Sequence, residues 1–178
     1  KMTIFEDLRG CASEKYIQWV RRAVAIPLNV CARPWYANLP TQDAIKRAEA
    51  IMNDRVTGYD HVKDEVLKMI CQHTSGGTCA SHYSLGLEGA PGTGKTHFVR
   101  NALAQAMDRP VVEVKLGGAA DISYLLGQMY TYEGSKEGRL VEGLIESGCC
   151  NPIFYFDEPD KISESDRGRD ISSFLIHL

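Results

Sequence analysis

The sequence has no strong excess of charge of either sign. Its 178 residues include 20 Lys and Arg against 23 Asp and Glu, which gives a formal net charge of −3 and a pI of about 6.0. Nucleic acids and anionic membrane surfaces attract clustered positive charge, so this balance gives no electrostatic case for either. We therefore expect no nucleic-acid partner on the grounds of charge.

Long apolar runs are missing as well. No stretch approaches the roughly 20 apolar residues that a membrane-spanning helix requires, and the first thirty residues lack the pattern of a secretory signal peptide. We therefore expect neither a membrane partner nor secretion. Because the chain starts at Lys1 rather than Met, targeting information upstream of it is left open.

Cysteine is too sparse and too scattered for a secreted disulfide scaffold. The six cysteines are Cys11, Cys31, Cys71, Cys79, Cys149 and Cys150. Four zinc-type side chains nonetheless gather in the pattern Cys71-x-His73-x5-Cys79-x2-His82, whose spacing matches no common zinc site. Two interpretations remain: a zinc site, or a helix end and a Ser-Gly-Gly loop that carry these side chains without a metal.

A glycine-rich octapeptide is the most informative feature that is present. It reads Gly89-Ala90-Pro91-Gly92-Thr93-Gly94-Lys95-Thr96 and fits the phosphate-binding P-loop pattern G-x-x-x-x-G-K-S/T. Glycines let the backbone turn with positive φ and bring N–H groups close to phosphate oxygens. We expect Lys95 to reach the β- and γ-phosphates and the Thr96 hydroxyl to ligate Mg²⁺.

The segments on both sides of the octapeptide support a phosphate-binding loop. Residues 95–109 have the period of a helix, whose positive N-terminal end would point at an anion. The expected apolar face of this helix consists of Phe98, Val99, Ala102, Leu103 and Ala106. Residues 83–88 form a weaker apolar stretch, which we expect to be the strand before the loop. The alternative, a chance glycine-rich turn, does not account for this context.

A second apolar run ends in two carboxylates. Ile153-Phe154-Tyr155-Phe156 precedes Asp157 and Glu158, and a buried strand here would deliver both to the edge where parallel sheets bind ligands. We expect Asp157 to hold Mg²⁺ and Glu158 to polarise the water that attacks the γ-phosphate. Alone, the pattern also describes a core strand entering a polar turn. Paired with the P-loop, it predicts magnesium-dependent hydrolysis of a nucleoside triphosphate.

Helix and strand patterns alternate along the chain, which predicts an α/β fold with a parallel sheet flanked by helices. Thr41 is expected to cap the helix that it begins. We expect helices at residues 4–33, 41–52, 60–72, 121–126 and 139–146, with a strand at 111–115. These patterns divide the chain into an N-terminal helical extension with a linker, residues 1–38, and a P-loop ATPase domain, residues 39–178.

From Ile17 onward the sequence resembles the Lon family of AAA+ ATP-dependent proteases, specifically the start of their ATPase module. The family's order and spacing are kept in Gly58 to Glu65, Gly89 to Thr96, Leu116-Gly117-Gly118, Thr131 to Gly134, Gly138-Arg139-Leu140 and Asn151 to Lys161. The resemblance implies an AAA+ P-loop fold that binds ATP with Mg²⁺. An ATP site implies a reducing compartment, such as the cytoplasm or the mitochondrial matrix, where free thiols are the default.

The resemblance further implies a machine that unfolds proteins. Members of the family assemble into rings, usually hexamers, in which ATP turnover moves loops that grip an unfolded protein substrate. The family's gripping pair of an aromatic and an apolar residue corresponds to Tyr132 and Glu133, so the aromatic is present and its neighbour is acidic. The alternative is an exposed loop tyrosine without a role.

Two more departures from the family concern the nucleotide site. Where the family usually has His-Tyr-Gly near the adenine, this chain has Val56-Thr57-Gly58, which implies weaker contacts with the base. Pro159 replaces an aliphatic residue directly after Glu158. Because proline fixes φ and lacks an N–H donor, it would alter how Glu158 points.

The resemblance leaves three functional hypotheses. The chain stops at Leu178, before the family's polar sensor, arginine finger, helical domain and Ser-Lys peptidase, so we expect a piece of a longer protein or a shortened relative that binds nucleotide better than it hydrolyses it. The first hypothesis is the ATPase module of a Lon-like protease. The others are an AAA+ chaperone or remodeller without a peptidase, suggested by Glu133, and a structural or assembly subunit, suggested by the altered adenine turn and Pro159.

Overall fold

The computed structural model describes residues 14–75, 83–129, 135–163 and 165–177. The chain folds into two compact units, each assembled from separate stretches of sequence. Unit 1 comprises Lys1–Cys31, Val112–Cys150 and Phe156–Leu178, and unit 2 comprises Ala32–Val111 and Asn151–Tyr155. The predicted boundary between residues 38 and 39 stays a prediction.

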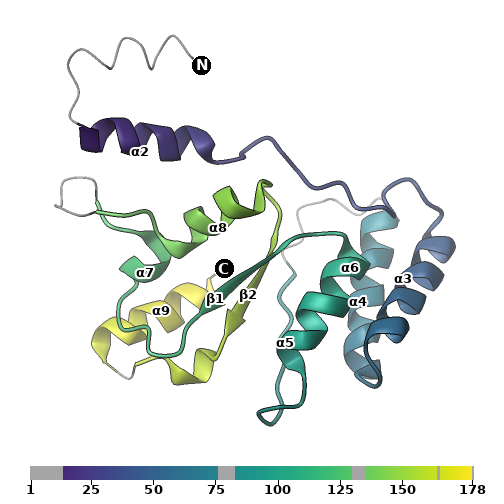
Figure 1. Cartoon of the computed structure of the whole chain (residues 1–178). Helices are drawn as coiled ribbons and strands as arrows, with labels where there is room; N and C mark the ends of the chain where they lie inside the picture. The colour runs from purple at the N-terminus through teal and green to yellow at the C-terminus, as the bar shows by residue number, and fades with distance from the viewer. Residues whose placement is uncertain (1–13, 76–82, 130–134, 164, 178) are drawn as a thin grey trace. The chain divides into compact units, whose positions relative to one another are not determined.

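Unit 2 is built on a layer of helices (Figure 1). Its elements are α3 (Thr41–Arg55), α4 (Asp60–Thr74) and one helical stretch made of α5 (Lys95–His97), the π-helical η1 (Phe98–Leu103) and α6 (Ala104–Met107). Their buried faces form one apolar core, and the predicted apolar face of the helix after the P-loop is confirmed as buried. The core residues include Ala44, Ala48, Met52, Val66, Ile70, Phe98, Val99, Ala102, Leu103 and Ala106.

The start of α3 differs from the prediction. Thr41 is the first helical residue rather than the cap, and Pro40 occupies the N-cap position without a side-chain hydrogen bond. The carbonyl of Pro40 instead accepts the N–H groups of Asp43 and Ala44, both at 3.0 Å. Proline fits at the start of a helix because its ring presets φ, which is −55° at Pro40.

Two strands pair in the order β1 (Val111–Lys115) and β2 (Ile153–Asp157), and both match the predicted segments. Ile153 N–H donates to the carbonyl of Pro110 at 2.8 Å, and Leu116 N–H donates to the carbonyl of Asp157 at 2.9 Å. Because these bonds advance in the same direction along both segments, the strands are parallel. The predicted α/β fold with a parallel sheet and helices is confirmed.

The strand predicted at residues 83–88 is wrong, because this stretch has no assigned strand. Leu85 and Leu87 pack against the core of unit 2 while their neighbours are exposed. Buried and exposed side chains therefore alternate as in an extended segment, but the segment pairs with no strand among the described residues. Gly86 contributes no side chain to packing, and the stretch lacks the β-branched residues that favour strands.

Unit 1 contains α2 (Glu14–Ala25), α7 (Ser123–Leu126), α8 (Arg139–Ser147), the 3₁₀ turn η2 (Pro159–Lys161) and α9 (Asp166–Ile176). Helix α2 does not extend to residue 33 as predicted. It ends at Ala25, since Pro27 disfavours helical geometry at the residue before it. Helix α9 was not predicted, although Ser165 gives a start signal: its hydroxyl accepts the Gly168 N–H at 3.2 Å.

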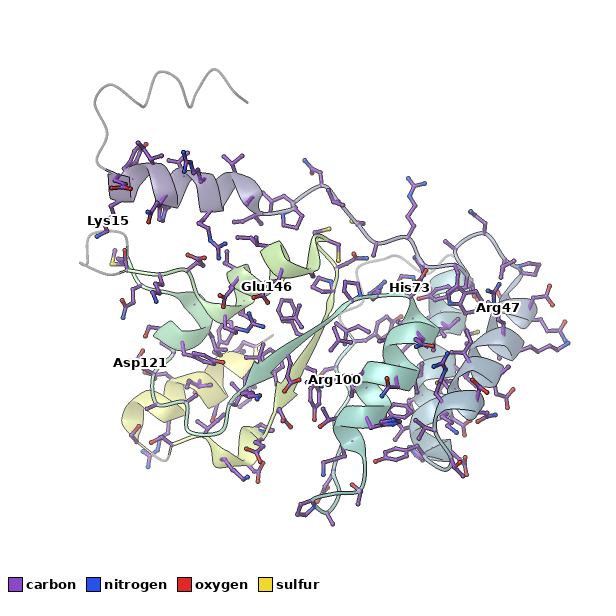
Figure 2. The ribbon with its side chains drawn as sticks, viewed as in Figure 1. Lys15, Arg47, His73, Arg100, Asp121 and Glu146 are labelled. Carbon is purple, nitrogen blue, oxygen red and sulfur yellow. The ribbon has the colours of Figure 1, made fainter. Side chains whose placement is uncertain are left out.

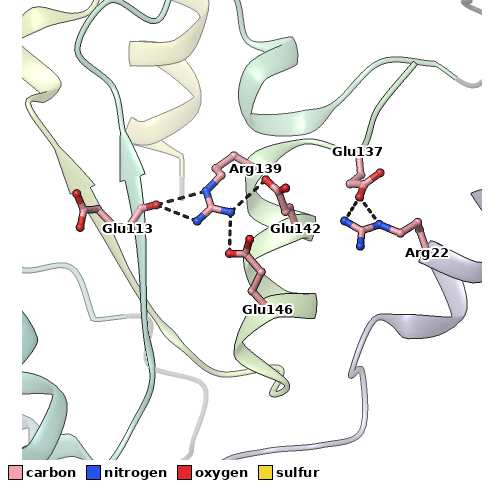
Figure 3. Close-up of polar contacts among 6 residues, drawn as sticks. All are labelled: Arg22, Glu113, Glu137, Arg139, Glu142 and Glu146. Carbon is pink, nitrogen blue, oxygen red and sulfur yellow. Dashed lines mark hydrogen bonds and ion pairs between the residues drawn. The ribbon is translucent and has the colours of Figure 1, made fainter. Parts of the chain in front are cut away.

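Arg139 at the start of α8 hydrogen-bonds to strand β1 (Figure 3). The Arg139 guanidinium donates to the Glu113 carbonyl at 3.3 and 3.4 Å and to the carboxylates of Glu142 and Glu146 at 3.1 and 2.8 Å. A second pair, Arg22 of α2 with Glu137, lies in the same unit. Near that pair, Gly127 and Glu137 form an antiparallel bridge.

The described helices contain no segment that is both long and apolar enough to cross a membrane. This finding covers the described residues alone.

Candidate nucleotide-binding site

The P-loop has the backbone that its sequence predicts. Gly92 and Gly94 have φ values of 80° and 97°, a region that side chains other than hydrogen disfavour. Gly94 is the N-cap of the helical stretch that starts at Lys95, and its carbonyl accepts the Phe98 N–H at 2.8 Å. The octapeptide therefore ends directly at the positive end of a helix, which is the geometry that suits a phosphate.

The loop is held in shape by hydrogen bonds to its first two carbonyls. The Lys95 ammonium donates to the carbonyl of Gly89 at 2.6 Å and to that of Ala90 at 2.9 Å. The Ala90 carbonyl also accepts from the Thr93 hydroxyl at 2.8 Å. These contacts hold the Lys95 ammonium, with its positive charge, against the start of the loop. All of these residues lie in unit 2.

Tyr59 connects the predicted adenine turn to the P-loop. Its hydroxyl donates to the Thr93 carbonyl at 3.0 Å, and its ring stacks on Phe98 with centroids 5.1 Å apart and planes 12° apart. Tyr59 itself has a φ of 61° and directly follows Val56-Thr57-Gly58. The structure therefore brings the end of this turn next to the P-loop. Sequence reasoning assigned no role to Tyr59, since its partner Thr93 is remote in sequence.

A buried lysine fixes the same turn. Lys63 is only 5% exposed, and its ammonium donates to the Asn53 side-chain oxygen at 2.8 Å and to the Val56 carbonyl at 2.6 Å. A buried charge needs such partners, because an unpaired one costs several kcal/mol. A sequence signal existed for this burial. Lys63 lies three and seven residues before the buried Val66 and Ile70, which places all three on one helical face.

The P-loop threonine contacts strand β2 within unit 2. The Thr96 hydroxyl lies 3.1 Å from the Tyr155 hydroxyl. Tyr155 and Asp157 are two residues apart on one strand, so their side chains leave it on the same face. Sequence reasoning treated Tyr155 only as part of an apolar run. Asp157 is the last residue of β2 and belongs to unit 1.

Glu158 is positioned by two neighbours in unit 1. It has a φ of 55° and precedes η2, where Pro159 is the first residue. Proline disfavours the right-handed helical region at the residue before it, and Glu158 lies outside that region. The Glu158 carboxylate pairs with the Lys161 ammonium and, through that hydrogen bond, raises the pKa of Lys161.

The second neighbour of Glu158 is Gly117, which lies two residues after the end of β1. A Cβ atom added at Gly117 would lie 2.6 Å from a carboxylate oxygen of Glu158. Real Cβ atoms do not approach an oxygen this closely, so the carboxylate uses the space that the glycine leaves. Gly117 belongs to the Leu-Gly-Gly segment that sequence analysis associated with the family but gave no role.

The remaining predicted residues are not tested. Tyr132 and Glu133 of the predicted gripping loop lie outside the described residues, as do Cys79 and His82 of the possible zinc cluster. In the described part of that cluster, the Cys71 sulfur lies 3.9 Å from the Ser75 hydroxyl. His73 lies at the C-terminal end of α4 (Figure 2), where its Nε2 is 3.4 Å from the Arg109 guanidinium.

Comparisons with known proteins agree with this geometry. Residues 85–178, more than half of the chain, match the model of the ATPase family associated with various cellular activities (AAA). The Lon protease of Heliobacterium modesticaldum is 35% identical over 149 residues, which are 81% of this chain and 18% of that protein. The Lon protease of Helicobacter pylori strain J99 is 46% identical over 87 residues, 49% of this chain and 10% of that protein.

A mitochondrial Lon protease homolog of Scheffersomyces stipitis is also similar, at 31% identity over 163 residues, 92% of this chain and 14% of that protein. The chain thus spans less than a fifth of the length of these three relatives. The match to the AAA model begins just before the P-loop and runs through β2 and Glu158. The chain belongs to the AAA family of ATPases, and it is an ATP-binding module similar to that of Lon proteases.

Proposed function

We propose that this chain is the ATP-driven part of a Lon-like protease, in which ATP hydrolysis drives the unfolding and translocation of protein substrates. The observation that carries the proposal is the P-loop of unit 2, with glycines at positive φ and a helix that starts at Lys95. The match to the AAA family and the similarity to Lon proteases support it.

Each predicted site residue has a role in this proposal. The P-loop amides and Lys95 bind the triphosphate, and Thr96 with Asp157 hold Mg²⁺, which neutralises charge on the phosphates. Glu158 accepts a proton from the attacking water. The adenine base would lie near the turn of Val56, Thr57 and Gly58.

The proposal extends to the whole protein. Copies of the chain would form a ring, and each copy would supply one gripping loop to it. Tyr132 would wedge against the backbone of an unfolded protein, and Glu133 would weaken the grip on acidic segments. A hexamer in the cytoplasm or the mitochondrial matrix fits this role.

The binding step is tested by calorimetric titration with Mg²⁺ and a slowly hydrolysed ATP analogue. The chain is expected to bind the analogue, and Lys95→Ala is expected to lose most of the affinity, because the ammonium that contacts the phosphates is gone. Lys46→Ala, on an exposed face of α3, is the matched control and should bind like the unaltered chain. Binding that is equal in the Lys95→Ala chain would contradict the proposal.

The hydrolysis step is tested with Glu158→Gln in the full-length protein. The amide cannot accept a proton from water, so the variant is expected to bind ATP with little change in affinity and to lose turnover by about 10²-fold or more. Phosphate release under saturating ATP measures this loss. Unchanged phosphate release would show that another group activates the water.

A remodeller without a peptidase is the second candidate, favoured by the acidic Glu133 in the predicted gripping loop. The two candidates differ in one product. In the full-length protein, ATP-dependent release of peptides from an unfolded substrate supports the protease. Stimulation of ATP hydrolysis by the same substrate without any peptide release supports the remodeller.

A further inference from the structure

Two cysteines that are far apart in sequence touch each other in unit 1. The sulfur atoms of Cys31 and Cys150 are 2.9 Å apart, although 119 positions separate the residues. Both are free thiols; Cys31 is exposed and Cys150 is half-buried. A disulfide has a sulfur–sulfur bond of about 2.05 Å, so the two atoms need to approach by less than about 1 Å to form one.

Hydrogen bonds hold the two cysteine segments side by side. Cys150 N–H donates to the Val30 carbonyl at 2.7 Å. Directly beyond the cysteines, the Asn151 side chain accepts the Ala32 N–H at 2.8 Å and donates to the Ala32 carbonyl at 3.1 Å. The backbone around both thiols is therefore already fixed, and closing a bridge requires little further ordering of the chain.

We propose that Cys31 and Cys150 form an oxidation site, at which a peroxide closes a reversible disulfide. The contact distance, the exposure of one thiol and the hydrogen bonds on either side of the pair carry this assignment. It does not depend on ATP binding or hydrolysis, because neither cysteine belongs to the proposed nucleotide site.

The chemistry balances with hydrogen peroxide as the oxidant. The exposed Cys31 thiol loses its proton, and its sulfur attacks one peroxide oxygen. The O–O bond breaks and the leaving hydroxide takes up that proton, so a sulfenic acid and one water result. The Cys150 sulfur then attacks the Cys31 sulfur, the S–O bond breaks, and a second water leaves with the Cys150 proton. Two thiols lose two electrons and two protons in total, and a dithiol reductant reverses the change.

The Cys150 thiol is expected to react in the second step rather than in the first. Its hydrogen bond with Cys31, followed by burial, raises the pKa of Cys150 above its ordinary value. The first attack is therefore expected at Cys31, which is the more exposed of the two. The neighbouring Cys149 is buried and contacts the Ser147 hydroxyl at 3.9 Å, so it does not compete for the same bridge.

The experiment oxidises the dilute, reduced chain with hydrogen peroxide, blocks the remaining thiols with an alkylating reagent and maps the cross-link by mass spectrometry. The expected product is a peptide containing Cys31 linked to one containing Cys150, with the loss of two hydrogen atoms. The Cys149→Ala chain should form the same link, whereas Cys31→Ser and Cys150→Ser should form none. Cys71→Ser is the matched control and should behave like the unaltered chain.

The melting temperature reports whether the native fold positions the two thiols. A bridge that fits the fold is expected to raise it by several degrees, because the cross-link restricts the unfolded chain across a long loop. Reduction should reverse the shift, and Cys31→Ser should show none. The proposal is overturned if both cysteines remain fully alkylated after oxidation, if the link survives in Cys150→Ser, or if closing the bridge lowers the melting temperature.

Discussion

At the scale of single residues, the proposed catalytic base is held by contacts that its own strand does not supply. Glu158 follows the last residue of β2, has a positive φ, and directs its carboxylate toward Lys161 on one side and the Gly117 backbone on the other. The position of this carboxylate therefore depends on the absence of a side chain at residue 117 as well as on the backbone of Glu158.

Gly117→Ala is expected to slow ATP hydrolysis while leaving nucleotide binding nearly intact. The added methyl group would lie 2.6 Å from a Glu158 oxygen, so the carboxylate has to move. A displaced base costs rate more than affinity, and a loss of about tenfold or more in turnover is expected. Phosphate release and calorimetric titration measure the two effects.

Gly86→Ala serves as the control for this change. Its added methyl group meets no atom within 4 Å, and its φ is not positive. The control should hydrolyse ATP like the unaltered protein. An equal loss of turnover in both variants, or none in Gly117→Ala, would contradict the positioning of Glu158 by the space at residue 117.

Lys63→Met is expected to destabilise the fold by about 2 kcal/mol, because the Val56 carbonyl and the Asn53 side chain lose a charged hydrogen-bond donor. Methionine keeps the length and the apolar character of the stem, so the effect reports the lost polar contacts. Urea unfolding measures it. Lys68→Met on the exposed face of the same helix is the control, and its unfolding should change by much less.

The sequence predicted the backbone of the P-loop, because the P-loop pattern describes one continuous turn. Gly92 and Gly94 have the expected positive φ, and a helix starts at Lys95. Tyr59 and Gly117 were not predicted as site residues, because each acts through a partner that is distant in the sequence. The partner of Tyr59 is Thr93, and that of Gly117 is Glu158. A single sequence gives no information on such pairs.

At the scale of elements, the C-terminal end of α4 has a titratable contact. The Arg109 guanidinium can only donate hydrogen bonds, so the His73 Nε2 that faces it at 3.4 Å has to be the unprotonated nitrogen. The ring also lies near those of Tyr36 and Tyr83. Burial, followed by the charge of Arg109, lowers the pKa of His73.

Acidification is therefore expected to weaken the fold through His73. A lowered pKa in the folded state means that the unfolded chain binds the proton more readily, so stability from this group is present above about pH 6.5 and is lost as the pH falls. Urea unfolding from pH 7.5 to pH 5 measures the loss. His73→Phe keeps an aromatic ring and should flatten this dependence.

His61→Gln, in the first turn of the same helix, is the control for the pH series, since His61 is exposed. It should retain the pH dependence of the unaltered chain. A dependence that is the same in His73→Phe as in the unaltered chain would assign the effect to another group.

Element prediction succeeded where side-chain pattern and pairing agree. The β-branched residues of Val111–Lys115 have a strand partner in β2, and that strand is confirmed. Residues 83–88 have the alternation of a strand without a described partner, so they stay extended and unassigned. Helix α9 was missed because its start depends on Ser165, a single polar residue in a stretch that shows no clear apolar period.

At the scale of the whole molecule, the two strands continue through both compact units. Val111 and the first three residues of β2 belong to unit 2, and the rest of both strands belongs to unit 1. A strand that begins in one unit and ends in the other makes independent unfolding of either unit costly. The chain is therefore expected to unfold as one cooperative system.

The two tryptophans test this cooperativity, because Trp19 belongs to unit 1 and Trp35 to unit 2. The single-tryptophan variants Trp19→Phe and Trp35→Phe report on one unit each by fluorescence. Each variant's fluorescence midpoint in urea is expected to coincide with its own midpoint by circular dichroism. A fluorescence midpoint clearly separated from the circular-dichroism midpoint in either variant would show that the units unfold independently.

The interleaving of the two units has a consequence for synthesis on the ribosome. Unit 2 needs Asn151–Tyr155 to be complete, and those residues are made after most of unit 1. The helices of unit 2 can form their shared core before that point, but the part of the core that Ile153 and Tyr155 cover stays open until β2 is made. Newly made chains would depend on chaperones during this interval.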